Sequence, residues 1–421
     1  MEKKLFAGVN ESLYTEKLNN GIDVYLYNTN KTKNFYISIS VKYGANVTKY
    51  KINNKIVDVI PGSAHFLEHK VMALSENVEI SRRINDLGSL ANAWTNYHGT
   101  NYNIFGSINL IENLKLLLDI FYNTNINEKC VNEEKGIIGE EIDMYKDQIN
   151  YYMFNQLFNN LFDNSYVKNT VVGERSDIEK ITAKSLNQIY NDYYIPNNTF
   201  IIICGNFDNE EVLNTLNEYM DNLNLKKKTL PKRIKEKERD LVPIAYQEIQ
   251  KEQEDVRVKY ALKIPRKCFK FKDDTFLKYY LGLLFNSYFS PSSKLYEKYK
   301  RENIIINMSS SVYQVDDYIV VIISAFCKDS KLFLDNISKD IKNINIDKIT
   351  FERKKKLFLK SFIVDFDNIE DVEYNICESI LMDGKVNYNE YNDISNMDYK
   401  TLESMIKELS FENISIIKTI K

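Results

Sequence analysis

Residues 60–72, with the sequence IPGSAHFLEHKVM, carry His65 and His69 four positions apart, with Glu68 between them. We expect a helix over residues 64–74, from which both imidazoles project on one face about one turn apart. At this spacing both histidines can bind one zinc ion. Glu68 lies on the same side, where it can take a proton from water and pass it to a leaving amine. The stretch therefore predicts a zinc-dependent peptide hydrolase.

Chance is a weak alternative explanation for this HxxEH string. The chain has three histidines, and the probability that two fall at this spacing with the glutamate in place is on the order of 10⁻³. The third histidine, His98, lies in the strand-like segment WTNYHGT, so we expect a carboxylate to complete the site. Glu134 and Glu141 are the best candidates, because they are seven positions apart and share a helical face. One can bind zinc while the other orients a ligand histidine.

The order of predicted elements indicates an α+β fold. Strands are expected over residues 34–43 and as a pair over 90–107, and helices over 78–87, 110–123 and 131–162. Helices thus alternate with strand pairs, which differs from the regular alternation of a doubly wound parallel sheet.

A weak internal repeat predicts two similar halves. Lys184-Ser185-Leu186, in a helix before the strand 200–203, aligns at an offset of 216 positions with Lys400-Thr401-Leu402, before the strand 416–417. Between Leu225 and Glu254 the apolar period is lost and the charged stretch KKKTLPKRIKEKERD appears, as in a linker. We therefore predict domains at 1–225 and 255–421, joined by a linker at 226–254.

Composition excludes several classes of protein. With 56 basic and 59 acidic residues the net charge is −3, so no overall field favours nucleic acid. The apolar runs are far shorter than the roughly 20 residues that cross a membrane. Five scattered cysteines without CxxC spacing argue against disulfides and thiolate metal sites. The N-terminal apolar stretch is too short for a signal peptide, so we expect a cytoplasmic protein.

Taken together, these features resemble the M16 metallopeptidases, the family of insulinase, pitrilysin and mitochondrial processing peptidase. The resemblance rests on HFLEH at 65–69, the E-x6-E pair Glu134/Glu141, the NAWT segment at 92–95 and YYIPNNTFIIICGNF at 193–207. The stretches IPGSAHFLEHKVM and EKGIIGEEIDMY look like small bacterial members of the YmfH type. The resemblance implies two similar α/β-sandwich halves, each an antiparallel-rich sheet with helices packed on it, joined by the charged linker.

The resemblance also implies roles for individual residues. His65, His69 and Glu141 would bind one zinc ion per chain, Glu68 would act as general base, and Glu134 would support the ligands. Asn92, Ala93, Trp94 and Thr95 would form an edge strand to which an extended substrate adds as a further strand; an ordinary hairpin is the alternative.

The second half departs from the pattern implied by the resemblance. Active relatives carry a downstream arginine and, seven residues later, a tyrosine that contact the substrate. Here Lys300 or Arg301 can supply the cation, but Asn307 stands where tyrosine is expected. At the offset of 216, the HxxEH residues align near Leu281, Leu284 and Phe285, so no second zinc site is expected.

The leading hypothesis is a zinc endopeptidase that cleaves peptides or unfolded segments. Because the tyrosine is absent, a second M16-like subunit that supplies the Arg/Tyr pair is one possible partner, and a homodimer is another. The alternatives are a peptide-binding or assembly subunit without hydrolytic activity, and a peptidase dedicated to maturing a bacteriocin or toxin peptide.

Overall fold

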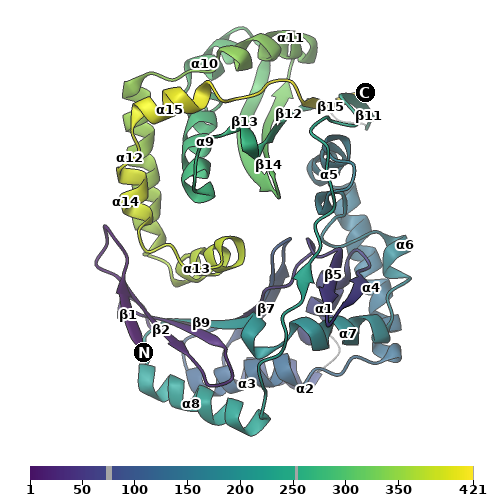
Figure 1. Ribbon diagram of the computed structural model, residues 1–421, viewed down its shortest axis with the longest axis vertical. Helices are drawn as coiled ribbons and strands as arrows, with labels where there is room; N and C mark the ends of the chain where they lie inside the picture. The colour runs from purple at the N-terminus through teal and green to yellow at the C-terminus, as the bar shows by residue number, and fades with distance from the viewer. Residues whose placement is uncertain (73–77, 252–254, 421) are drawn as a thin grey trace. The chain divides into compact units, whose positions relative to one another are not determined.

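The computed structural model describes residues 1–72, 78–251 and 255–420, and it divides into two compact units (Figure 1). Each unit is assembled from three stretches of the chain. The first unit comprises Met1–Tyr145, Asn169–Lys235 and Phe362–Glu390, and the second comprises Lys146–Lys168, Glu236–Ser361 and Tyr391–Lys421.

Seven of the described strands form the main sheet of the first unit, in the order β1-β2-β3-β9-β4-β8-β7. Neighbours pair antiparallel except β3 and β9, which are parallel. A small second sheet has the order β10-β5-β6. These strands are β1 (Glu2–Leu5), β2 (Ser12–Lys17), β3 (Asp23–Asn28), β4 (Phe35–Val41), β5 (Lys49–Ile52), β6 (Lys55–Asp58), β7 (Leu90–Thr95), β8 (Thr100–Gly106), β9 (Thr199–Gly205) and β10 (Lys232–Arg233).

Helices pack on both faces of this main sheet, and the alternation of strand β4 shows why. Ile37 and Ile39 point into the hydrophobic core with the helices α1 and α3, while Ser38 and Ser40 point to the opposite face, where helix α13 lies. The helices wholly or mainly in this unit are α1 (Ser63–Met72), α2 (Val78–Asp86), α3 (Leu110–Tyr122), α4 (Glu128–Asp147), α6 (Arg175–Ile178), α7 (Ala183–Tyr193), η2 (Pro196–Asn198), α8 (Asn209–Leu223) and α13 (Ile369–Asp383).

The second unit contains a sheet with the order β11-β15-β12-β14-β13, in which only the β11–β15 pair of the described strands is parallel. Its strands are β11 (Tyr246–Gln250), β12 (Val256–Pro265), β13 (Ile305–Val315), β14 (Tyr318–Cys327) and β15 (Ile414–Ile420). Its helices are α5 (Ile149–Leu161), η1 (Tyr166–Lys168), η3 (Arg266–Cys268), α9 (Asp274–Tyr288), α10 (Lys294–Arg301), α11 (Ser330–Asp340), η4 (Ile341–Asn343), α12 (Lys348–Asp365), α14 (Glu390–Ser395) and α15 (Tyr399–Ile406).

The two main sheets repeat one topology. The order β3-β9-β4-β8-β7 in the first unit corresponds to β11-β15-β12-β14-β13 in the second, including the parallel pair at the start. Helices α7 and α15, which precede β9 and β15, begin after the side-chain caps Thr182 and Asp398, at the predicted offset of 216. The prediction of two similar α/β halves is confirmed.

One helix of each sequence half belongs to the unit built mainly from the other half. Helix α5 contacts β12 and β15 of the second unit, and α13 contacts β4 and β9 of the first. The domains proposed at 1–225 and 255–421 therefore differ from the compact units in these two segments. Their residues bury apolar side chains against sheets that are distant in sequence, and periodicity alone carries no information about such contacts.

A single helix over residues 131–162 is not observed, and that prediction is wrong. Helix α4 ends at Asp147 and α5 begins at Ile149, because Gln148 between them has an extended backbone conformation. Other predicted elements are confirmed, including the strand expected over 34–43, which is β4. The last two residues of the helix predicted over 64–74 lie outside the described residues.

The charged segment predicted as a linker contributes a strand to each unit. Strand β10 pairs with β5, and β11 pairs in parallel with β15. Within the same segment, Glu238 accepts a hydrogen bond of 2.9 Å from the buried Nζ of Lys263. Residues 252–254 of this segment lie outside the described residues.

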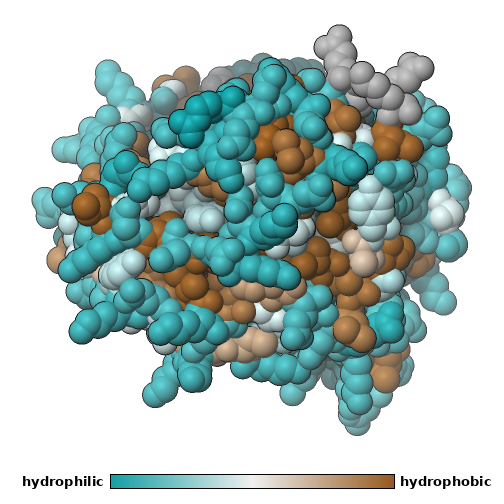
Figure 2. All heavy atoms as spheres, turned by 90° about the horizontal axis from the view of Figure 1, so that it is seen from above, coloured by the Kyte–Doolittle hydropathy of each residue, from teal (hydrophilic) through white to brown (hydrophobic). Residues whose placement is uncertain are grey.

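The surface mixes hydrophilic and apolar side chains. On the face shown in Figure 2, hydrophilic residues predominate and apolar residues form patches between them. Within the described residues, we find no helix with the length and apolar character needed to cross a membrane.

Candidate metal centre

Helix α1 presents the HxxEH residues because its other side is anchored in the core. Phe66 and Leu67 are fully buried, so His65, Glu68 and His69 face away from the main body of the core. The helix begins directly after Gly62, which has a φ of +85°; a Cβ atom there would lie 2.8 Å from the carbonyl oxygen of Val172. Glycine is therefore required at the entry to the helix.

Helix α4 brings a carboxylate to the two histidines. The Oε2 atom of Glu141 lies 3.6 Å from Nε2 of His65 and 3.4 Å from Nε2 of His69. One ligand atom from each of the three residues lies within 4.8 Å of the others, and no other group suited to a metal is found among the described residues. The three metal ligands proposed from the sequence therefore converge.

The opposite nitrogen of His69 is held by Glu134. Its Nδ1 lies 2.9 Å from Oε1 of Glu134. Glu134 lies two helical turns before Glu141 on α4. Glu134 is almost fully buried, and its other oxygen pairs at 2.7 Å with Nζ of Lys70, which is also buried. This hydrogen bond directs Nε2 of His69 toward Glu141.

Lys70 is a site residue that our sequence analysis missed. Its ammonium group neutralises Glu134 and also donates to the carbonyl oxygen of Cys130 at 3.2 Å. A buried carboxylate needs such a partner. One sequence signal could have indicated this role. Lys70 directly follows the HxxEH string and precedes the apolar residues Val71 and Met72, which are buried with it.

The electrostatics of the cluster favour exchange of a proton for a cation. Burial alone would lower the pKa of His69, but hydrogen bonds from its ring to Glu134 and Glu141 raise that pKa to about 9. Contacts with His65 and then His69 hold the pKa of Glu141 well below its usual range. At neutral pH and without metal, both ring nitrogens of His69 therefore carry a proton. A cation bound at Nε2 would replace the proton on that nitrogen.

The donor set fits zinc better than a hard cation. Two imidazole nitrogens and one carboxylate oxygen are the ligands of catalytic zinc sites, which keep a fourth position open, whereas calcium and magnesium prefer oxygen ligands. The Nδ1 atom of His65 is buried and has no hydrogen-bond partner among the described residues. Its Nε2 is the nitrogen that faces Glu141.

Glu68 is held by a threonine of the neighbouring edge strand. The hydroxyl of Thr95 donates a hydrogen bond of 2.5 Å to Oε2 of Glu68. Glu68 is partly buried and adds to the negative charge that acts on His69. The proposed general base thus stands beside the metal-suited cluster without belonging to it.

The segment predicted to bind substrate forms an edge strand. Strand β7 is the last strand of its sheet and pairs only with β8 among the described strands. Asn92 is exposed and Ala93 partly buried on β7. Trp94 lies on the face that carries α13, with its ring centroid 6.1 Å from that of Tyr374. The side chain of Thr95 contacts Glu68 instead of facing outward.

The candidates from the second half lie in the second unit. Lys300 and Arg301 are exposed at the end of helix α10, and Nζ of Lys300 donates to the carbonyl oxygen of Ile306 at 3.0 Å. The side-chain oxygen of Asn307 accepts hydrogen bonds from the hydroxyl of Tyr296 and the backbone of Met308. Their contact with substrate stays a prediction.

His98 takes no part in the metal-suited cluster. It lies in the turn between β7 and β8, where its Nδ1 is 3.3 Å from the side-chain nitrogen of Asn46. The expectation of a carboxylate instead of His98 as the third group agrees with this placement.

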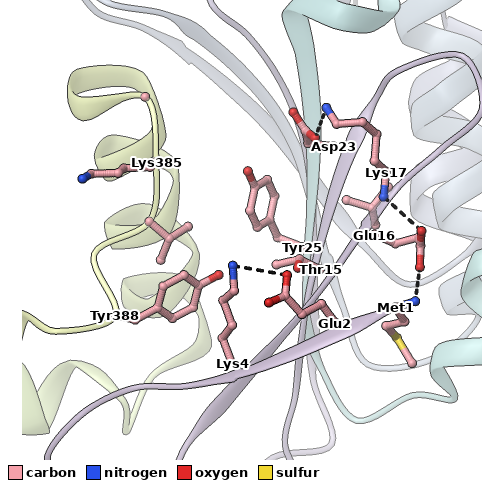
Figure 3. Close-up of a pocket in the computed structure, with 13 residues that line it drawn as sticks. Met1, Glu2, Lys4, Thr15, Glu16, Lys17, Asp23, Tyr25, Lys385 and Tyr388 are labelled. Carbon is pink, nitrogen blue, oxygen red and sulfur yellow. Dashed lines mark hydrogen bonds and ion pairs between the residues drawn. The ribbon is translucent and has the colours of Figure 1, made fainter.

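The first unit also has a pocket of about 720 Å³ away from these residues (Figure 3). It is bordered by strands β1–β3 and by residues 384–388. Three ion pairs border it: the amino group of Met1 with Glu16, Lys17 with Asp23, and Lys4 with Glu2. Lys385 lies on the opposite side of the pocket. These residues single out no particular ligand for the pocket.

Two family models match the chain one after the other. "Insulinase (Peptidase family M16)" matches residues 28–175, and "Peptidase M16 inactive domain" matches residues 180–358. Together they span most of the chain, and the first contains the whole cluster on α1 and α4. The chain therefore belongs to the M16 family of metallopeptidases, as the sequence motifs indicate.

Similar proteins agree with this assignment. The uncharacterized zinc protease YmfH of Bacillus subtilis is 31% identical over 215 residues, which cover 51% of this chain and 50% of that protein. A probable mitochondrial-processing peptidase subunit beta of Schizosaccharomyces pombe is 25% identical, over 50% of this chain and 45% of that protein. The matched region thus spans about half the length of these relatives.

A solved structure shows the same fold over nearly the whole chain. The crystal structure of an M16-like peptidase from Alicyclobacillus acidocaldarius covers 99% of this chain and 100% of its own, with a TM-score of 0.89 and 19% sequence identity. At this identity the likeness establishes the fold and leaves the chemistry to the residues of the site. The predicted two-part M16 fold is confirmed.

Proposed function

We propose that this chain is a zinc-dependent endopeptidase that hydrolyses peptides or unfolded polypeptide segments. The observation that carries the proposal is the convergence of His65, His69 and Glu141, with Glu68 standing free of the cluster beside them. A site that only stored or structurally used a metal would need no separate carboxylate. Membership of a metallopeptidase family supports the same reaction.

In the proposed mechanism, three side chains would hold one zinc ion and a fourth would orient one of the ligands. Nε2 of His65, Nε2 of His69 and a carboxylate oxygen of Glu141 would hold the ion, while Glu134 accepts a hydrogen bond from Nδ1–H of His69 and thereby fixes its tautomer. When bound, zinc supplies Lewis acidity, which polarises the scissile carbonyl group and activates water.

Glu68 moves the proton in this mechanism. Its carboxylate accepts a proton from the attacking water and then delivers it to the nitrogen of the leaving amine. One carboxylate oxygen is held by Thr95, so the other is free to face the reacting water. The carboxylates of Glu134 and Glu141 are engaged by histidine nitrogens, which leaves Glu68 as the available base.

Strand β7 is the proposed binding edge for the substrate. An extended peptide that adds to this edge would use main-chain hydrogen bonds, which tolerate varied sequences and require an unfolded segment. Asn92 and Ala93 lie along this edge, and Trp94 offers an apolar surface on one face of it. Lys300 or Arg301 is the proposed cation for the substrate from the second unit.

A second subunit is a proposed partner because Asn307 replaces the tyrosine expected from the family pattern. The partner would be another M16-like chain that supplies the Arg/Tyr pair, or a second copy of this chain. One relative is named a subunit of a processing peptidase, which makes a paired assembly plausible for this family. We also propose a cytoplasmic location, on the basis of the scattered, unpaired cysteines.

The decisive test is cleavage of a mixture of unstructured peptides by the zinc-loaded protein, with products identified by mass spectrometry. Glu68→Gln is the matched variant, because it keeps the three metal ligands and removes the base. We expect the wild-type protein to cleave the peptides and the Glu68→Gln variant to leave them intact. Zinc bound by both proteins with no cleavage by either, even when a paired M16-like chain is added, would contradict the proposal and favour a peptide-binding subunit.

A further inference from the structure

Thr95 links the edge strand β7 to the side chain of Glu68. It is the last residue of β7, and its hydroxyl lies 2.5 Å from Oε2 of Glu68 on helix α1. A hydroxyl group has a single proton to donate. The Oγ1 atom of Thr100 is a second neighbour, at 3.3 Å, but the closer and charged acceptor is Glu68.

The neighbouring threonine cannot take over this role. The hydroxyl of Thr100 donates its own proton to the carbonyl oxygen of Tyr43 at 3.1 Å. Thr95 is the donor to Glu68, because a hydroxyl group can donate a hydrogen bond and a carboxylate accepts one. A single donor thus holds one oxygen of Glu68 in place.

The backbone that carries Thr95 is held on both sides. Within β7 it pairs with Thr100 across the sheet, and the turn that follows is closed by Asn96, whose side-chain oxygen accepts from the backbone of His98 and Gly99 at 2.7 and 2.9 Å. The side-chain nitrogen of Asn96 donates to Glu378 of helix α13 at 2.7 Å. A donor on so constrained a segment can fix the position of its acceptor.

The alternation of β7 separates the two functions of Thr95. Trp94 faces α13 and Thr95 faces α1, so the side chain of Thr95 is committed to Glu68 while its backbone belongs to the free edge of the sheet. The expected contact of Thr95 with substrate is one of the main chain, which the commitment of its side chain to Glu68 leaves available. A peptide on the edge would be in register with the strand that positions the base.

We propose that Thr95 is a positioning residue, which orients the Glu68 carboxylate through its hydroxyl and so couples the substrate-binding edge to the general base. This inference rests on the proposed peptidase function. The terminal torsion of a glutamate is broad, so without this donor the carboxylate would turn away from the reacting water in part of the molecules. Misplacement of this kind lowers turnover more than it weakens binding.

The test compares Thr95→Val, which keeps the shape and removes the hydroxyl, with Thr95→Ser, which restores a hydroxyl. In the valine variant we expect kcat to fall about 10- to 100-fold with KM within about twofold of wild type, and with unchanged zinc content. The serine variant should recover most of kcat. Thr199→Val is the matched control, because Thr199 is a buried sheet threonine whose hydroxyl bonds the carbonyl of Pro196.

A crystal structure of each variant separates this inference from the proposed function. We expect Glu68 to keep its position in the serine variant and the Thr199→Val control, and to move in Thr95→Val, whether or not the protein cleaves peptides. A wild-type protein that cleaves nothing would count against the peptidase, while a moved Glu68 would still support the positioning role. An unmoved Glu68 in Thr95→Val, or a kcat equal to that of wild type, would overturn it.

Discussion

Helices α1 and α9 occupy the same place in the repeated topology, after a central strand and before the paired edge strands, yet they use it in opposite ways. Helix α1 places His65, Glu68 and His69 around a metal-suited site. The aligned positions of α9 are Leu281, Leu284 and Phe285, each with no exposed surface. One scaffold therefore supports either a metal-suited cluster or a continuous core, depending on a few residues of one helix.

The far faces of the two sheets show a second contrast, in how each treats a buried charged residue. In the second unit, Nζ of Lys263 is paired with Glu238 at 2.9 Å and lies over the rings of Phe162 and Tyr318. In the first unit, Glu373 of α13 has neutral partners, the hydroxyl of Ser38 and the amide of Asn101. Burial therefore raises the pKa of Glu373 to about 7.

The largest effect should come from making α1 resemble α9 at one position. His65→Leu removes a metal ligand, so we expect loss of zinc binding and of all detectable peptide cleavage, measured by metal analysis and mass spectrometry. His98→Leu is the matched control, since His98 lies outside the metal-suited cluster, and it should keep its zinc. Zinc retained at the wild-type level in His65→Leu would contradict the assigned ligands.

The reverse change tests the core of the second unit. Leu281→His places a polar ring among fully buried apolar side chains, and we expect a loss of about 3–5 kcal/mol in the free energy of unfolding. Denaturant unfolding followed by fluorescence would measure it. Leu281→Met, which nearly conserves volume, should cost less than about 1.5 kcal/mol. Equal stability of the two variants would show that this position is not packed as described.

Glu373 should make stability depend on pH. Because its folded pKa of about 7 exceeds the ordinary value of 4.5, the folded protein retains a proton that the unfolded chain releases. The contribution of Glu373 to the free energy of unfolding is therefore fully present below about pH 4.5. It is lost as the pH rises to about 7, and the total loss is roughly 3 kcal/mol.

The variant Glu373→Gln tests this dependence, since the amide has no proton to lose in that range. We expect its stability relative to wild type to increase by up to about 3 kcal/mol between pH 5 and pH 8, as measured by thermal unfolding. Glu370→Gln, an exposed carboxylate on the same helix, should show little of this change. If the wild-type protein instead gained stability relative to Glu373→Gln over this pH range, the raised pKa of Glu373 would be contradicted.

The smallest effect is expected at the residue that supports a ligand. Glu134→Gln weakens the hydrogen bond to His69, so zinc affinity should fall about 10- to 100-fold, measured by competition with a chelator. Glu133→Gln is the control, because Glu133 is the exposed neighbour on the same helix. A loss as large as that of His65→Leu would make Glu134 a ligand and would remove the distinction between ligand and support.

The positions of the candidate site residues on their helices follow from local periodicity. The spacing of four between His65 and His69 and of seven between Glu134 and Glu141 places each pair on one helical face, and both pairs are found as expected. The strand pairs and the repeat were also readable, because alternation and capping residues are local signals.

Contacts between residues distant in the sequence were not predictable in this way. Three such contacts join segments that no sequence period relates. They are the ion pair of Lys70 with Glu134, the hydrogen bond from Thr95 to Glu68, and the packing of α5 and α13 on sheets built mainly from the other half of the chain. The same limit explains the predicted continuous helix over 131–162, since only packing reveals that its two parts serve different units.

The sequence by itself determined that two imidazoles and a carboxylate share one helical face, a pattern that favours a metal ion bound beside a base. It also determined that the pattern occurs in one half only, since Leu281, Leu284 and Phe285 can bind no metal. Helical spacing left open whether Glu134 or Glu141 meets the histidines, and only the family resemblance favoured Glu141. The tertiary structure alone decided which lysine neutralises Glu134 and which hydroxyl holds Glu68. Those choices depend on distances between separate elements, and only the packed core sets them.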